Sequence, residues 1–131
     1  MTYYKKDLIA YRLERARESL RDAEILFDNG GSPASVVNRA YYSIFYATLA
    51  LLVTAETEPS KHSGAISKFD ELFVKRGEFP KEMSQIIHRA FDMRQAGDYQ
   101  KSITLTREQA FETLGSAKEF LKRVTGKISN G

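Results

Sequence analysis

Arg94, Asp98 and Tyr99 follow one another within six residues and form the segment of this sequence best suited to chemistry. Arginine brings a rigid, permanently charged fork that matches a phosphate or a carboxylate group. Asp98 comes four residues after Arg94, so the two can form an ion pair if a helix continues that far, although Gly97 lies between them. The segment is therefore open to two interpretations, an internal ion pair beside a packed tyrosine or a functional pocket.

His62 is the second candidate, and it follows Lys61 directly ahead of an expected helix. Histidine changes charge near neutral pH, so His62 could bind an anion or act as a base. The structural alternative is that it caps the helix or forms a hydrogen bond to a neighbouring helix. We favour the structural alternative from the sequence alone.

An aromatic helix, expected over about residues 32–53, must position these groups. Its apolar side chains cover most of its circumference, which is typical of a helix buried on several sides. Asn38, Arg39 and the hydroxyls of Tyr41 and Tyr42 place polar groups in the same helix. Because buried polar groups need partners, this region is either a hydrogen-bonded core network or the wall of a site.

The remaining elements are also helices, since no strand pattern or hairpin turn competes with them. Glycine and proline residues and apolar periodicity predict helices over about residues 6–28, 32–53, 63–75, 80–96 and 106–126. Thr106 followed by Gln109 is a capping-box pattern at the start of the last helix. We expect an all-α, up-and-down bundle of four to five helices in a single domain, residues 1–131. Its core covers about residues 6–125, and the tail after Gly126 is expected to fray.

Composition narrows the function classes. The 131 residues include no cysteine and two histidines, so a thiolate metal site and a histidine-rich metal site are both unsupported, and we expect no metal and no cofactor. No apolar run approaches the roughly 20 residues of a membrane span. We therefore expect a soluble, cytoplasmic protein. The net charge of +3 permits an anionic partner without identifying one.

Taken together and in order, several segments resemble the HEPN domain proteins of prokaryotes. The matching segments are 40–52, 62–64, 69–77, 94–99 and 117–121, within a stretch from about Lys6 to Thr125. The resemblance implies a helical bundle that dimerises, with two arginine-bearing helix ends forming a shared cleft. It also implies a toxin or defence role, often metal-independent RNA cleavage, and a minimal nucleotidyltransferase as partner and antitoxin.

One departure from the family pattern bears on activity. Active relatives carry a histidine four to six residues after the arginine. The window after Arg94 holds Tyr99, Gln100 and Lys101 and no histidine. Histidine suits proton transfer near neutral pH, while arginine stays protonated. We therefore expect a HEPN module with weak or no catalysis.

In this hypothesis the module binds a nucleotidyltransferase, and a nucleotide or RNA in a homodimer cleft. The expected site residues are Arg94, Asp98, Tyr99, His62, Arg39, Tyr42 and Lys61. The first alternative is an endoribonuclease toxin that uses Arg94 with His62, Asp98 or Tyr99. The second is a purely structural helical protein.

Overall fold

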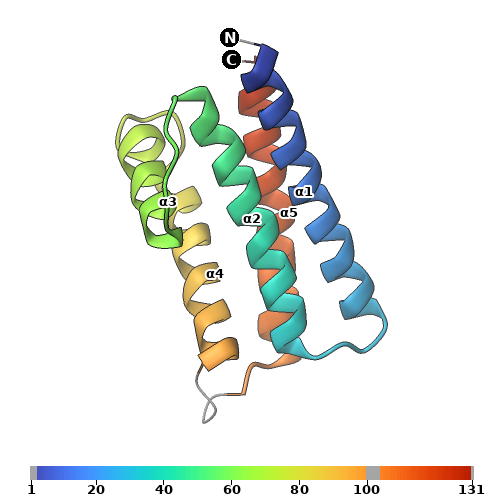
Figure 1. The fold of residues 1–131 in the computed structure, drawn as a ribbon. Helices are drawn as coiled ribbons and strands as arrows, with labels where there is room; N and C mark the ends of the chain where they lie inside the picture. The colour runs from blue at the N-terminus through green and yellow to red at the C-terminus, as the bar shows by residue number, and fades with distance from the viewer. Residues whose placement is uncertain (1–2, 100–103, 131) are drawn as a thin grey trace.

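Four long helices run alternately in opposite directions in a computed structural model, which describes residues 3–99 and 104–130 (Figure 1). In chain order the elements are α1 (Tyr3–Asp28), α2 (Pro33–Thr54), α3 (His62–Phe69), a π-helical turn η1 (Asp70–Val74), α4 (Lys81–Tyr99) and α5 (Arg107–Asn130). No strand occurs in these two described ranges. The expected all-α, up-and-down bundle is thus confirmed.

Local signals explain where the helices begin. The Ser32 side chain accepts a hydrogen bond from the backbone N–H of Ser35 at 3.1 Å, and Pro33 occupies the first turn of α2. At the start of α5, the Thr106 hydroxyl accepts from the backbone N–H of Gln109, while the Gln109 side chain accepts from that of Thr106. This reciprocal pair is the predicted capping box.

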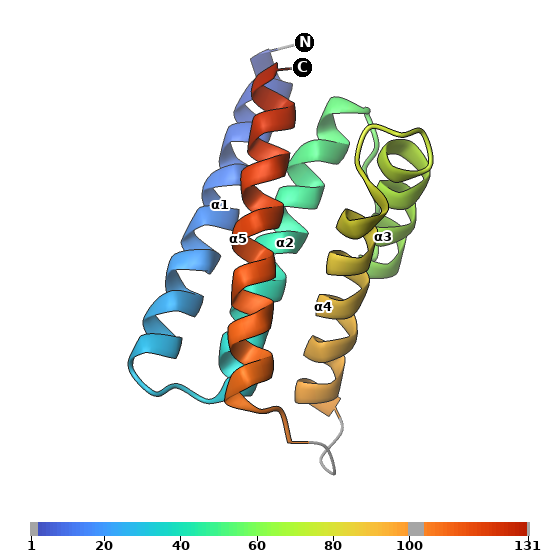
Figure 2. The ribbon, with the colours of Figure 1, turned by 180° about the vertical axis from the view of Figure 1, so that it is seen from behind.

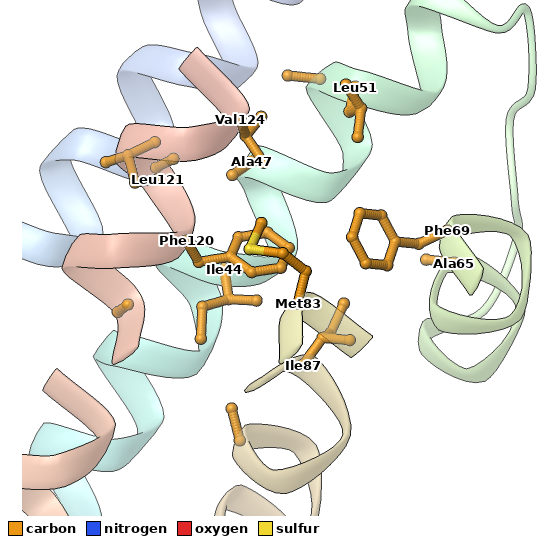
Figure 3. Packing of buried hydrophobic residues seen from close by; sticks show 14 of the residues in the cluster. Ile44, Ala47, Leu51, Ala65, Phe69, Met83, Ile87, Phe120, Leu121 and Val124 are labelled. Carbon is orange, nitrogen blue, oxygen red and sulfur yellow. The ribbon is translucent and has the colours of Figure 1, made fainter. Parts of the chain in front are cut away.

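Helix α2 is the central element of the bundle. It packs most extensively against α1 and also against α5, α4 and α3 (Figures 1 and 2). Figure 3 shows side chains from α2, α3, α4 and α5 meeting in the core. The largest of these fully buried residues are Ile44, Leu51, Phe69, Met83, Ile87 and Phe120. Burying such side chains stabilises a fold by about 1.5–3 kcal/mol each.

The expectation that the chain has no membrane span can be examined at the same helix, α2. By length and composition alone, α2 could cross a membrane, but 67% of its most apolar window is buried inside the bundle. Burial among other helices is the condition of a core helix in a soluble protein. Nothing in its packing indicates a membrane location.

Helix α4 continues further than predicted. The expected end near Ala96 and Gly97 is wrong, because α4 extends to Tyr99. A Cβ at Gly97 would lie 2.9 Å from Cδ1 of Leu105 and 3.4 Å from Cβ of Ala34. Glycine is therefore used here for close packing against neighbouring segments, and not to end the helix. The sequence also predicts a connection over residues 98–105, of which residues 100–103 lie outside the described part of the chain.

Helix α5 also continues further than predicted, through Asn130, so fraying after Gly126 is a second incorrect expectation. Ile128 packs against the core cluster, and Lys127 forms an ion pair with Glu78 at 3.1 Å. These contacts hold the last turns, which the glycine by itself does not break. The first helix likewise begins at Tyr3, ahead of the predicted Lys6.

The helix predicted over residues 63–75 is divided into α3 and η1, and Gly77 follows with φ of 81°. Before α3, the chain leaves α2 and runs back along the outside of the bundle, so α3 begins about halfway along α2 (Figure 1). This return places His62, the first residue of α3, beside the middle of α2. The backbone thereby brings one candidate site residue next to the aromatic helix.

Candidate functional site

Three helices bring five side chains into one cluster. Tyr41, Tyr42 and Phe45 come from α2, His62 comes from the start of α3, and Arg94 comes from α4. We call these five residues the Arg94 cluster. Tyr41 is fully buried, whereas the other four are partly exposed. The cluster therefore has a buried anchor and an open side.

Arg94 lies against two aromatic rings of this cluster. Its Cζ is 5.3 Å from the Tyr41 ring centroid and 5.4 Å from the Tyr42 ring centroid, both within the range of a cation–π interaction. Its Nε donates to Oδ2 of Asp98 at 3.1 Å. The Arg94 side chain is 14% exposed, so it is held in place but not sealed.

His62 is held by a hydrogen bond and by stacking. Its Nδ1 lies 2.7 Å from the Tyr41 hydroxyl. Its ring stacks on Phe45 with centroids 3.9 Å apart and planes 3° apart, while the Tyr42 ring meets it edge-on at 5.8 Å. The sequence left open a helix cap or a hydrogen bond to a neighbouring helix, and the structure shows the second. The residue at the N-cap position of α3 is Lys61 and not His62. The Lys61 side chain forms no capping hydrogen bond.

The surroundings shift the pKa values of three cluster residues. Burial raises the pKa of Tyr41 far above its usual range, and the charge of Arg94 offsets this only in part. Burial, followed by the charge of Arg94, lowers the pKa of His62. Partial burial opposes the charge on Arg94, but Tyr42, Asp98 and Tyr41 outweigh it and raise the pKa. Near pH 7 the cluster thus holds a neutral phenol, a neutral imidazole and a cation.

The other predicted site residues lie around the cluster to different extents. Arg39 has its Cζ 5.0 Å from the Tyr42 ring centroid and donates to Oδ1 of Asn38, so it borders the cluster. Lys61 is exposed and has no ion pair or hydrogen bond from its side chain among the described residues. Tyr99 ends α4, and its side chain lies outside the part that the structure describes.

Sequence reasoning missed two members of the site. The sequence left Tyr41 open between a hydrogen-bonded core network and the wall of a site, and it did not single out Phe45. In the structure Tyr41 hydrogen-bonds His62, and Phe45 stacks on it. Their spacing of four residues places both on one face of α2, which is a signal present in the sequence. What the sequence could not supply is the position of His62 opposite that face.

The Arg94 cluster can bind an anion through the guanidinium of Arg94 and the polar groups of the neighbouring rings. In residues 3–99 and 104–130 no three histidine, aspartate or glutamate side chains gather as a metal site would require. Arginine supplies charged N–H donors to phosphate oxygens, and partly exposed aromatic rings can stack with bases. The geometry is therefore suited to a phosphate-bearing ligand with an aromatic base.

Comparisons with known proteins agree with this picture of the fold. A model of the HEPN domain family matches residues 9–128. A UPF0332 protein of Thermotoga maritima is 38% identical over 120 residues, covering 92% of this chain and 90% of that protein. "Putative toxin MJ0142" of Methanocaldococcus jannaschii is 37% identical over 120 residues, covering 92% of this chain and 80% of its own.

A solved structure shares the fold at lower sequence identity. The crystal structure of TT1696 from Thermus thermophilus has a TM-score of 0.77 and 21% sequence identity. The alignment covers 91% of this chain and 97% of that one. At this identity the likeness concerns the arrangement of helices alone.

Proposed function

The chain belongs to the HEPN domain family, and on that premise we propose that it is the toxin-type module of a two-component system that binds RNA at the Arg94 cluster. The proposal takes the whole chain as one HEPN-like domain acting in the cytoplasm. It assigns weak or no catalysis to this domain. Two relatives with toxin names, 37% and 36% identical to this chain, support the toxin assignment.

One observation carries the RNA assignment. Arg94 is partly open to solvent and lies over two tyrosine rings, one of which is itself partly exposed and bordered by Arg39. A phosphate oxygen can take the charged donors of Arg94, and a base can stack on Tyr42. A purely structural role would not need an arginine and an aromatic ring on an open side.

Binding is tested with a fluorescently labelled single-stranded RNA of about 12 nucleotides, within the site sizes of known single-strand binders. Arg94→Ala removes a charge-assisted contact of about 1.5–3 kcal/mol and should weaken binding about tenfold or more. Arg89→Ala is the matched control, because Arg89 also lies on α4 but pairs with Glu112 on α5. Arg89→Ala should change the affinity less than about twofold.

Two outcomes would contradict the RNA assignment. One is that the folded parent protein binds no RNA at low salt. The other is equal affinity of the parent and the Arg94→Ala variant. If the parent protein binds a mononucleotide and not RNA, and Arg94→Ala loses this binding, the ligand of the site is a nucleotide.

Dimerisation and the partner enzyme belong to the same proposal. In a symmetric pair, two copies of the Arg94 cluster would face each other and enclose the RNA. Light scattering at micromolar concentration should give twice the mass of 14.9 kDa. A minimal nucleotidyltransferase encoded beside this chain should co-purify with it and reduce RNA binding. A monomer at all concentrations would remove the shared cleft from the proposal.

A second candidate function is metal-independent RNA cleavage, and one observation favours it. His62 packs on the same two tyrosine rings as Arg94, although no histidine follows Arg94 in the chain. In such cleavage a base would take the proton of the 2′-hydroxyl as that oxygen attacks the phosphorus. The bond to the 5′ oxygen then breaks, and that oxygen takes up a proton. This route requires an unprotonated nitrogen of His62 on the open side.

A further inference from the structure

The Tyr41–His62 hydrogen bond can run in either of two directions. Either the Tyr41 hydroxyl donates to Nδ1, or a protonated Nδ1 donates to the hydroxyl oxygen across the same 2.7 Å. In a neutral imidazole the two cases differ in which nitrogen carries the proton. In the first case Nε2 is an N–H donor, and in the second it is an acceptor that can serve as a base.

Arg94 decides between these two directions. Its guanidinium lies over the Tyr41 ring, with Cζ 5.3 Å from the centroid, and its charge acts on the phenol oxygen. A nearby permanent cation favours the hydroxyl orientation in which the oxygen faces the charge and the O–H points away. The nitrogen that accepts this O–H is Nδ1 of His62.

The protonation states of the two residues agree with this direction. Tyr41 is fully buried, and its raised pKa keeps the hydroxyl proton in place. Among the residues that the structure describes, 3–99 and 104–130, the charged and titratable groups placed against His62 are Tyr41 and Tyr42 on α2 and Arg94 on α4. None of the three is a carboxylate that would stabilise a protonated imidazole.

The ring is also prevented from flipping about its Cβ–Cγ bond, which would exchange Nδ1 with the carbon Cδ2. The stack on Phe45 holds the ring plane within 3° of the phenyl plane, and the buried hydroxyl holds Nδ1. A half-turn of the ring would move Nδ1 away from its hydrogen-bond partner. It would leave a buried hydroxyl unsatisfied, which costs free energy.

We propose that Tyr41 is a positioning residue that holds His62 as the neutral tautomer protonated on Nε2, so that His62 donates to a phosphate oxygen beside Arg94 and does not act as a base. The proposal deepens the proposed function, because it rests on a phosphate-bearing ligand at the Arg94 cluster. It also gives a physical reason for weak or no catalysis: an Nε2 that already carries a proton cannot take one from a 2′-hydroxyl.

The tautomer can be measured directly by NMR on the parent protein labelled with ¹⁵N-histidine. The sequence holds two histidines, and His88, whose Nε2 lies 2.6 Å from Asp70 Oδ2, serves as an internal reference. At pH 7.5 we expect the pyrrole-type nitrogen signal of His62 at Nε2 and the pyridine-type signal at Nδ1. Tyr41→Phe keeps the ring and removes the hydroxyl, and it should convert His62 to a mixture of tautomers while His88 stays unchanged.

Two NMR results would overturn the proposal. One is a pyrrole-type Nδ1 in the parent, and the other is a His62 spectrum that Tyr41→Phe leaves unchanged. Neither result depends on RNA. Loss of the proposed function would instead appear as an absence of RNA binding with the His62 tautomer as expected.

RNA binding supplies the second measurement. His62→Leu removes the donor and should weaken RNA binding about fivefold to tenfold, in line with one lost hydrogen bond. His62→Gln restores an N–H donor near the position of Nε2 and should recover most of that loss. A glutamine cannot replace a general base, so parent RNA cleavage that is lost in His62→Gln would overturn the proposal in favour of the base.

Discussion

Arg94 and Asp98 form an ion pair 3.1 Å long on successive turns of α4, because the helix continues through Gly97. The Asp98 carboxylate occupies a donor of the guanidinium that the proposed RNA phosphate would use. Its side chain is 28% exposed, so this pair is only partly screened by water. Asp98 thus positions Arg94 and at the same time competes with an anionic ligand.

Asp98→Asn should therefore raise RNA affinity, by about twofold to fivefold at low salt, since a partly exposed pair contributes at most about 1 kcal/mol. Fluorescence anisotropy titrations at 50 and 200 mM salt would measure the RNA affinity of the parent and of Asp98→Asn. Glu112→Gln removes the ion pair that Arg89 of α4 forms with α5, so it is the control and should leave the affinity unchanged. A weaker affinity in Asp98→Asn would mean that positioning outweighs competition.

The stability of the protein should depend on pH through His62. Its pKa in the fold is below the ordinary value of 6.5. As pH falls from 6.5 through the lowered pKa, the unfolded chain binds a proton that the folded chain does not, so the free energy of unfolding decreases. Urea unfolding between pH 8 and 5 should show the parent losing stability relative to His62→Gln. The carboxylates are the same in both proteins. Subtracting the free energy of unfolding of His62→Gln from that of the parent at each pH therefore removes their contribution.

Two glycines in helices should respond oppositely to alanine. A Cβ at Gly115 on α5 meets nothing within 4 Å, so Gly115→Ala should stabilise the protein by about 0.5–1 kcal/mol. A Cβ at Gly97 would lie 2.9 Å from Leu105, so Gly97→Ala should give no gain and a loss of up to about 2 kcal/mol. Chemical denaturation would measure both. A gain in Gly97→Ala would show that the α4 contact is loose.

Glu56 lies in the left-handed region, with φ of 55°, just after α2. Its N–H bonds the carbonyl of Val53, and the next N–H, of Thr57, bonds that of Leu52, which is a Schellman ending that glycine usually occupies. Glu56→Gly should stabilise the protein by about 1 kcal/mol. Glu56→Ala keeps the Cβ and removes only the exposed ion pair with Lys5, so it should give no gain. A similar melting temperature for both variants would contradict the argument.

The sequence by itself determined the helical class, the turns and most of the core. Ile66, Phe69 and Phe73, for example, recur in the sequence at the spacing of one helix face, and all three are buried. The capping pattern at Thr106 and Gln109 placed the start of α5 because a cap depends on residues within one turn. Arg94 and His62 were also identified from residue type, although their relation was not.

Only the tertiary structure decided where the helices α4 and α5 end and which side chains meet. Gly97 and Gly126 predicted breaks. Packing of Gly97 against Ala34 and of the partly buried Ile128 against the core outweighs the low helix propensity of glycine, which is about 1 kcal/mol. The site itself joins Tyr41 to His62, 21 residues apart in the chain. That contact depends on the return of the chain along the outside of α2 (Figure 1). Local residue spacing carries no signal for such a path, because the path is fixed by packing between distant segments.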